Sequence, residues 1–294
     1  MIWIAATVAA AALQVARNGL QRSLMAGAGP WGATLVRFLF GLPFSLILAV
    51  VACLLTPGAR PSFSIGFWGV AAAGALAQVL ATAALLVAMR RGGFAVATAL
   101  QQSSLPLAAI LGLFVFGDRL SATAWIGVAA TSAGLAALSW PRRGAAGERP
   151  ATGAVFGLAS GLAFGFSLNA FRRAGLELEP AHRVYAAIVS LCVVQAMQAA
   201  GLGLYLAARD RAALRAVAAG WRASVGAGFF GAAASACWFI AVALSPAGPV
   251  RAVGVIEAPI AALAGRRFFK ETLRPAQILA GLAVLAGVVM TSLW

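Results

Sequence analysis

Acidic residues, histidine and lysine are scarce in this chain of 294 residues. Asp and Glu together number seven, there is one histidine, His182, and the 22 basic residues include one lysine, Lys270. Catalytic triads and histidine-ligated metal sites place histidine beside acidic groups, so we expect neither an enzyme active site nor a metal centre. The three cysteines, Cys53, Cys192 and Cys237, lack the paired spacing of a zinc site or a disulfide framework. Nothing in the sequence calls for a cofactor.

Hydrophilic stretches are also scarce. The chain is 62% hydrophobic and 10% charged, with a mean hydropathy of +0.94. A soluble domain of this length cannot bury so much apolar surface, so lipid must surround the chain. A bilayer core about 30 Å thick requires about 20 helical residues per crossing. The composition therefore predicts an all-α integral membrane protein.

Apolar runs between charge clusters and Gly/Pro breaks predict ten transmembrane helices. Their ranges are about 2–20, 31–55, 64–89, 94–116, 121–140, 151–171, 181–207, 222–244, 248–268 and 274–293. The first run lacks a basic leader, which indicates a retained span rather than a cleaved signal. The most polar internal stretch, 141–152, separates five spans from five. We therefore expect a first unit at 1–140, a linker at 141–152 and a second unit at 153–294.

The two predicted units share a repeated phrase. PLAAILGLFVFGDRL, at 106–120, and PIAALAGRRFFKETL, at 259–273, begin 153 residues apart. A second match, at an offset of 151, places Asn18 over Asn169. A unit with five spans ends on the opposite side of the membrane from where it began, so its second copy is inverted. The predicted fold is two inverted five-helix repeats.

The basic residues predict the orientation in the membrane. Loops after spans 1, 3, 5, 7 and 9 hold 15 of them, with Arg17 counted after the first span, and the opposite side holds five. The positive-inside rule places the loops after odd-numbered helices in the cytoplasm and both termini outside. The formal charge of +15 lies in these loops, as expected beside anionic lipid, so no nucleic-acid partner is expected.

Glycines four residues apart form a stripe on the sixth span, at Gly153, Gly157, Gly161 and Gly165. Such a stripe allows two helices to approach closely. It fits tight packing inside the bundle or, alternatively, the interface of a homodimer, so both a monomer and a homodimer are compatible with the sequence.

Glu257 is the only acid predicted in the middle of a span. A charge at that depth costs about 2.5 kcal/mol or more, so it must face protein or water. Its repeat equivalent, Ser104, ends a polar stretch in the other unit. That stretch is Gln101, Gln102, Ser103 and Ser104. Prolines follow both positions, at Pro106 and Pro259, and each removes a helix hydrogen bond. We expect these prolines to act as hinges and the polar stretch and Glu257 to line a substrate cavity.

Glu257 has several possible roles. It could carry a proton, act as the countercharge of a substrate amine, or form an ion pair with Arg37 or Arg251, the arginines placed inside spans. Arg251 is six residues away and would lie on another face of a continuous helix. Arg37 belongs to another span and could reach Glu257, bind a substrate carboxylate, or snorkel to the headgroups.

Further polar and aromatic side chains fall inside predicted spans. Asn18, Asn169 and Gln78 are candidates for substrate contacts, although each could equally join two helices through a hydrogen bond. Trp238 could stack on a substrate or pack in the ordinary way.

The duplicated Pro-x11-Asp/Glu-x-Leu phrase, followed in each unit by a glycine-rich closing span, resembles the EamA branch of the drug/metabolite transporter superfamily. The closing glycines are Gly127, Gly134, Gly281 and Gly287. The resemblance implies ten helices in two inverted repeats, a central cavity open to one side at a time, and export of a small metabolite or toxic compound. Many such proteins begin with a charged cytoplasmic segment, whereas this chain begins Met1-Ile2-Trp3. We follow the charge count for the orientation.

The expected function is secondary transport. The chain would export a small metabolite, such as an amino acid, or a drug-like compound by alternating access in the inner membrane. It would either couple export to protons through Glu257 or work as a facilitator. No GxxxxGK[ST] loop supports direct use of ATP. The alternatives are an integral-membrane enzyme acting on lipid-linked substrates and a non-transporting scaffold.

Overall fold

Helices form all the regular structure in the described part of the chain, which confirms the all-α prediction there. The computed structural model describes residues 1–116, 121–139, 150–269, 279, 282 and 286. In chain order the helices are α1 (Ile2–Leu39), α2 (Leu42–Leu55), α3 (Ile65–Gly92), α4 (Phe94–Gln101), α5 (Ser104–Phe116), α6 (Ala122–Ser139), α7 (Pro150–Leu178), α8 (Arg183–Arg209), α9 (Arg211–Ala219), α10 (Trp221–Leu244), α11 (Ala247–Gly254) and α12 (Glu257–Phe269).

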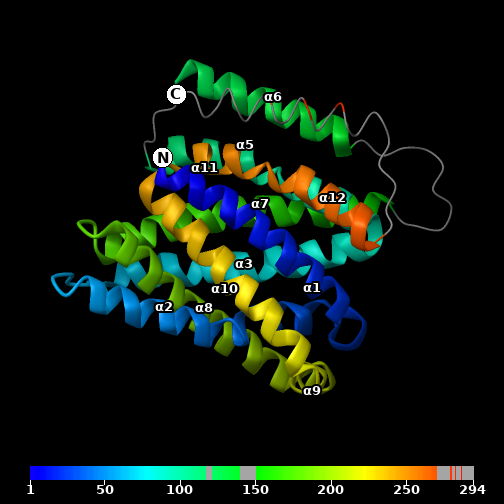
Figure 1. The fold of residues 1–294 in the computed structure, drawn as a ribbon, viewed down its shortest axis with the longest axis horizontal. Coiled ribbons are helices and arrows are strands. Elements are labelled where there is room, and N and C mark those ends of the chain that lie inside the picture. The colour runs from blue at the N-terminus through cyan, green and yellow to red at the C-terminus, as the bar shows by residue number, and fades with distance from the viewer. Residues whose placement is uncertain (117–120, 140–149, 270–278, 280–281, 283–285, 287–294) are drawn as a thin grey trace.

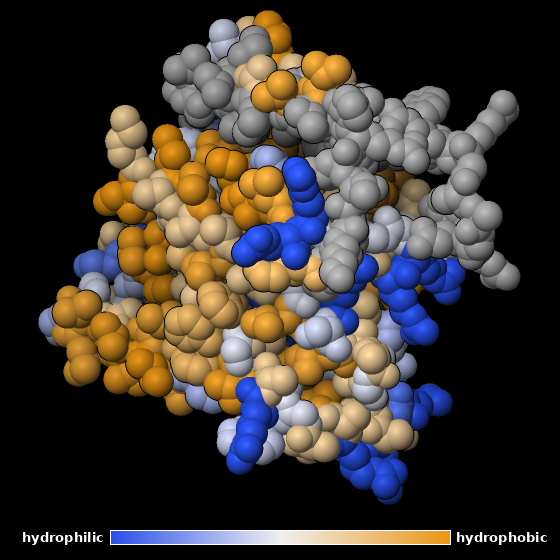
Figure 2. All heavy atoms as spheres, turned by 45° about the vertical axis from the view of Figure 1, so that its right-hand side comes forward, coloured by the Kyte–Doolittle hydropathy of each residue, from blue (hydrophilic) through white to orange (hydrophobic). Residues whose placement is uncertain are grey.

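Seven stretches of the described residues are long and apolar enough to cross a membrane. They are Ile2–Leu55, Ile65–Gly92, Phe94–Phe114, Thr152–Leu178, Arg183–Arg209, Trp221–Leu244 and Ala247–Phe268. Large apolar side chains also point outward, among them Ile47, Leu55 and Phe114. Figure 2 shows such hydrophobic residues over much of one face, with most of the hydrophilic residues toward one side. The protein is therefore a multi-pass membrane protein.

Eight of the ten predicted spans correspond to these seven stretches. The fifth predicted span, 121–140, coincides with α6, which is not among the seven. Three differences from the prediction remain. The first two spans meet in one long helix, α1, which is interrupted at Gly29, where φ is +65°. That backbone conformation favours glycine, and Pro30 follows it. The linker was expected to run to residue 152, but α7 already begins at Pro150. The tenth span, 274–293, and residues 141–149 of the linker lie outside the described residues, apart from 279, 282 and 286.

The third difference is α9, which the sequence analysis treated as a loop. The carboxylate of Asp210 caps this helix by accepting a 2.9 Å hydrogen bond from the backbone N–H of Ala213. Ala213 and Val217 are buried on one face, while Arg211 and Arg215 are exposed on the other. A nine-residue amphipathic helix has no long apolar run, so a search for spans passes over it.

Helices from the two halves of the chain pack mainly on each other. The most extensive contacts join α1 to α10 and α3 to α7. In Figure 1, α1 and α10 run side by side across the near side of the molecule. Helices α4 and α5 lie against α7, whereas α11 and α12 lie against α1, and α2 packs on α8. The core is therefore built between the halves.

Two helices are interrupted at matching places. The break between α4 and α5 leaves the carbonyl of Gln102 to accept a 2.9 Å bond from the N–H of Leu105. The break between α11 and α12 leaves Val255 to accept a 2.9 Å bond from Ala258. In each case the next residue is proline, at 106 or 259, which cannot donate the bond of a regular helix to that carbonyl.

The glycine stripe of α7 covers the first of these breaks. A Cβ at Gly161 would lie 2.7 Å from the carbonyl oxygen of Gln101 and 3.0 Å from the nitrogen of Ser104. A Cβ at Gly157 would lie 2.7 Å from the Cβ atom of Leu100. The stripe therefore packs inside the bundle, as the first of the two interpretations predicted.

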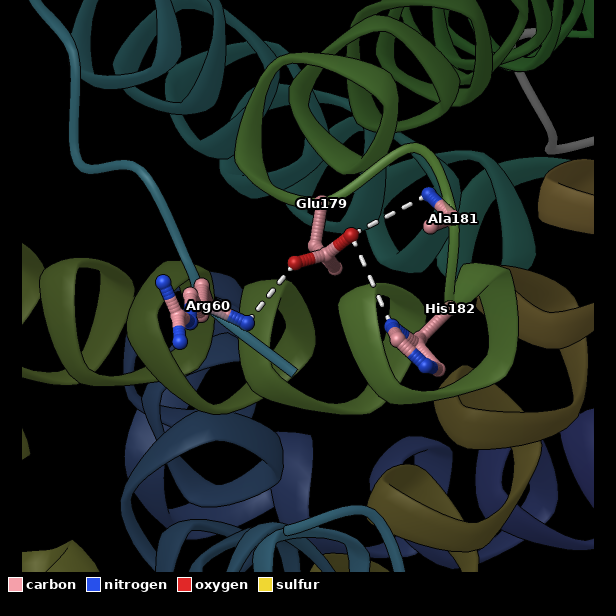
Figure 3. Close-up of polar contacts among 4 residues, drawn as sticks. All are labelled: Arg60, Glu179, Ala181 and His182. Atoms are coloured by element: carbon pink, nitrogen blue, oxygen red, sulfur yellow. Dashed lines mark hydrogen bonds and ion pairs between the residues drawn. The ribbon is translucent and has the colours of Figure 1, made fainter. Parts of the chain in front are cut away.

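Glu179 joins two loops at the end of the molecule where α2 and α7 finish (Figure 3). Its carboxylate accepts hydrogen bonds from the backbone N–H of Arg60 at 2.8 Å and of Ala181 at 3.1 Å, and it lies 3.6 Å from His182 Nδ1. The N–H of Arg60 is the main cause that lowers the pKa of Glu179, and partial burial opposes it. The carboxylate thereby fixes the loop before α3 to the loop after α7.

Candidate functional site

Glu257 lies at the centre of a buried polar cluster. It is the first residue of α12 and its side chain has no exposed surface. The amide nitrogen of Gln102 donates a 3.0 Å hydrogen bond to its Oε2 atom, and that of Asn18 donates a 3.4 Å bond to Oε1. The break after α4, helix α1 and helix α12 therefore converge on one carboxylate, and Asn18, Gln102 and Glu257 are brought together as candidate site residues.

Arg251 joins this cluster through Gln102 rather than through Glu257. Its Nη2 atom donates a 2.5 Å bond to Oε1 of Gln102, and its guanidinium lies 4.9 Å from the ring centre of Trp238. Trp238 in turn donates a 2.9 Å bond from Nε1 to Oε1 of Gln14. The break between α11 and α12 separates Arg251 from Glu257, and Gln102 bonds to both side chains.

Arg37, on α1, is buried against α3 and α10. Its Nη1 and Nη2 atoms donate to the hydroxyls of Thr82 at 2.9 Å and Ser235 at 3.1 Å. Only 1% of the residue is exposed, so it does not snorkel to the headgroups. Within the described residues neither Arg37 nor Arg251 forms an ion pair with Glu257, which removes the predicted direct pair from the possible roles.

Arg17 is a site residue that the sequence analysis missed by counting it with a cytoplasmic loop. It is fully buried near the middle of the first segment of α1, and its Nη2 atom donates a 2.6 Å bond to Oδ1 of Asn18. The correction leaves 14 of the 15 basic residues on the predicted cytoplasmic side. A signal was present: Gln14, Arg17, Asn18 and Gln21 recur at helical spacing on one face, and all are buried.

The charges of this cluster are unbalanced. Arg17, Arg37 and Arg251 all interact electrostatically with Glu257, which is the only carboxylate among the described residues that does so. Arg17 and Arg37 also repel each other. Gly231 of α10 makes room for both, because a Cβ there would lie 3.0 Å from Cγ of Arg37 and 3.5 Å from Cδ of Arg17. The cluster therefore contains three buried guanidinium groups and one buried carboxylate.

Several buried polar atoms around the cluster have no hydrogen-bond partner among the described residues. On the arginines they are Nη1 of Arg17, Nε of Arg37 and Nε of Arg251. On the polar stretch beside the first break they are Oε1 of Gln101 and the hydroxyls of Ser103 and Ser104. Because buried polar atoms are nearly always paired, this concentration marks the cluster as the candidate site for a polar ligand.

The remaining predicted residues lie elsewhere. Gln78 accepts a 2.8 Å bond from Gln198, which ties α3 to α8. Asn169 donates to the carbonyls of Gly165 at 3.0 Å and Ala108 at 3.4 Å, and lines a hollow of about 380 Å³ between α3, α5 and α7. Both therefore make the kind of bond between helices that the sequence analysis kept as the alternative to a substrate contact. Pro106 and Pro259 each stand third in the helix that follows a break.

Comparison with known proteins supports the fold. No family model and no curated protein matches the chain. A crystal structure of another protein is similar over 98% of this chain and 98% of its own, with a TM-score of 0.66 and 19% sequence identity. A likeness at this identity shows a shared fold and carries no information on activity.

Proposed function

We propose that this protein is a secondary transporter that exports a small metabolite, such as an amino acid, or a drug-like compound by alternating access, as its resemblance to the EamA transporters implies. The observation that carries the proposal is the charged cluster around Glu257, which is sealed from solvent between two interrupted helices, one from each half of the chain. Interrupted helices at membrane depth are tolerated where they line a binding cavity.

The contacts between helices support two inverted repeats. Exchanging the halves converts the α1–α10 pair into the α7–α3 pair, and the contacts of α4 and α5 with α7 into those of α11 and α12 with α1. Asn18 bonds to α12 of the other half, and its repeat equivalent Asn169 bonds to α5. An odd number of spans in each unit makes such an exchange an inversion in the membrane.

The lengths of the described helices are compatible with nine of the ten proposed crossings, and the tenth lies outside the described residues. The 54 residues of Ile2–Leu55 would measure about 80 Å as one helix, against a bilayer core of about 30 Å. The interruption at Gly29 divides them into two crossings. Each pair of consecutive helices, α4 with α5 and α11 with α12, then forms one crossing.

Pro106 and Pro259 are the hinges of this proposal. The carbonyl four residues before each proline accepts a hydrogen bond from the residue three positions later, because the proline has no N–H to donate. Bending at these positions therefore breaks few regular helix hydrogen bonds. Rocking one unit against the other about these points would open the cluster to each side of the membrane in turn.

We propose that export of the substrate is coupled to the movement of a proton, which Glu257 carries. The test uses purified protein in proteoliposomes that enclose a pH-sensitive dye, with metabolites and drug-like compounds added one at a time. We expect at least one compound to move protons, the Glu257→Gln variant to lose this movement while still purifying as a folded protein, and the Glu177→Gln variant, changed at the end of α7, to retain it. Transport that requires ATP, or proton movement that persists in Glu257→Gln, would contradict the corresponding part of the proposal.

The proposed orientation places the basic end of the molecule in the cytoplasm. Exposed arginines there lie in the last turns of α3, α8 and α12 and on α9. In a variant whose native cysteines are replaced by alanine, a membrane-impermeant maleimide should label Gly58→Cys in intact cells. It should label Ala212→Cys of α9 only after permeabilisation. The reverse pattern would show that the termini are cytoplasmic.

A further inference from the structure

We propose that the cluster binds a small oxyanion with a charge near −2, such as a phosphate monoester or a dicarboxylate. The inference rests on the proposed function in taking this cluster as the substrate site. The inference specifies the chemical class of the substrate, which the similarity in fold does not indicate.

The charge of the cluster is the first observation. Three buried arginines, Arg17, Arg37 and Arg251, stand against Glu257, so their formal sum is two positive charges. Each arginine at the centre of a membrane protein costs about 2.5–3.5 kcal/mol even by the lenient measure of insertion experiments. A buried charge without a countercharge is strongly destabilising, so an anion that supplies two negative charges would stabilise this arrangement.

The hydrogen bonds of the cluster are the second observation. Both carboxylate oxygens of Glu257 accept from neutral amides, those of Gln102 and Asn18, and not from a guanidinium. Nη1 of Arg17, Nε of Arg37 and Nε of Arg251 are buried and have no acceptor within the described part of the chain. Guanidinium donors match the oxygens of carboxylate and phosphate in number and geometry. The donors that the protein leaves unpaired are therefore those that an oxyanion requires.

The same charges disfavour a cationic substrate. A substrate amine next to Glu257 would share the buried cluster with three guanidinium groups, and like charges repel strongly where water is excluded. Of the roles predicted for Glu257, countercharge of an amine is thus the least compatible with the cluster. As a negative group beside the anion, Glu257 would instead weaken its binding and help its release.

The test measures binding to the full-length protein in detergent by thermal shift at pH 7.5 and constant ionic strength. The probes are inorganic phosphate, glycerol 3-phosphate and succinate, with putrescine as a cation and leucine as a zwitterion. We expect at least one oxyanion to raise the melting temperature saturably, because it binds only the folded state. Putrescine should have no such effect.

Three variants identify the site. Arg37→Gln and Arg251→Gln should each weaken oxyanion binding about tenfold or more, because each removes one positive charge that attracts the anion. A tenfold loss corresponds to about 1.4 kcal/mol of binding free energy. Arg266→Gln, on the exposed end of α12, should leave it unchanged. Glu257→Gln should strengthen it, because the variant removes a negative charge. The direction of the change in affinity in Glu257→Gln tests the oxyanion site even if the arginine variants do not fold.

The outcomes separate the oxyanion proposal from the transport proposal. Three results would overturn the oxyanion site. The first is that no oxyanion raises the melting temperature. The second is that an oxyanion stabilises Arg37→Gln and Arg251→Gln as much as the wild type, and the third is that Glu257→Gln binds the oxyanion more weakly than the wild type. Proteoliposome flux of an amine or a neutral compound that depends on the cluster would overturn it while leaving transport intact. Oxyanion binding with the predicted variant pattern but without flux would support the site and contradict transport.

Discussion

The amide nitrogen of Gln102, at the break between α4 and α5, donates a 3.0 Å hydrogen bond to Glu257, the first residue of α12. The amide oxygen of the same side chain accepts from Arg251. A neutral side chain from the first half of the chain thus stands between an acid and a base of the second half. It satisfies both while keeping them from forming a closed ion pair, which leaves part of the guanidinium for another partner.

Replacing this bridge should destabilise the protein strongly. Gln102→Leu would leave one oxygen of Glu257 and one nitrogen of Arg251 buried without a partner, at a cost of about 3 kcal/mol or more. Gln195→Leu is a matched control, because Gln195 donates only to the backbone carbonyls of Phe38 and Arg37. Thermal unfolding in detergent should show a clearly larger drop for Gln102→Leu, and equal drops would mean that the bridge does not hold the charges.

The two repeat-equivalent asparagines should also differ. Asn18 contacts both Glu257 and Arg17. Among the described residues, in contrast, Asn169 donates only to backbone carbonyls and its Oδ1 atom has no partner. Asn18→Leu should therefore lower the free energy of unfolding by about 1–3 kcal/mol, and Asn169→Leu by about 1 kcal/mol or less. Melting temperatures measured side by side test this order. A larger loss for Asn169→Leu would argue against the described cluster.

Gly161 should not tolerate a side chain. In Gly161→Ala the new Cβ would lie 2.7 Å from the carbonyl oxygen of Gln101, so the break between α4 and α5 would have to move, at about 1–3 kcal/mol. Gly175, on the same helix, has open space around its Cβ position. Gly175→Ala should leave stability unchanged or raise it by about 0.4–1 kcal/mol. If both variants melt together, α7 does not cover the break as described.

Glu179 should make stability depend on pH in the acid range. Its pKa is lowered in the folded protein, chiefly by the N–H of Arg60, so the folded state favours the ionised carboxylate. That contribution is present above the usual carboxyl pKa of about 4.3 and is lost as the pH falls through the lower folded value. Melting temperatures between pH 7 and pH 3.5 should therefore fall less steeply in Glu179→Gln than in the wild type.

A control for this pH dependence is Glu177→Gln, which changes a carboxylate that pairs with Arg173 at the surface of the same helix. Its acid profile should follow that of the wild type. An unchanged profile in Glu179→Gln would show that the two loops are held together by other contacts.

Much of the architecture was predictable because it depends on local properties of the sequence. Apolar runs fixed where helices form, and the prolines at 106 and 259 marked the two interruptions, since a missing N–H is a local fact. Glu257 was found because a lone acid in an apolar run is costly wherever that run packs. In contrast, Arg17 was missed because its depth depends on where the first segment of α1 ends. The apolar pattern placed that end at about residue 20, whereas the helix continues to the interruption at Gly29.

The sequence by itself determined that this is a multi-pass helical membrane protein whose most polar buried positions precede two prolines. Only the tertiary structure decided which side chains meet there. Arg17, Arg37 and Arg251 come from three separate segments, and Gln102 reaches Glu257 across 155 positions of the chain. Such contacts depend on how helices from the two halves pack, through glycines such as Gly231 and Gly161 that permit close approach. The periodicity of one helix does not indicate which other helix packs on it. The excess of positive charge around Glu257 is therefore seen only in the folded molecule.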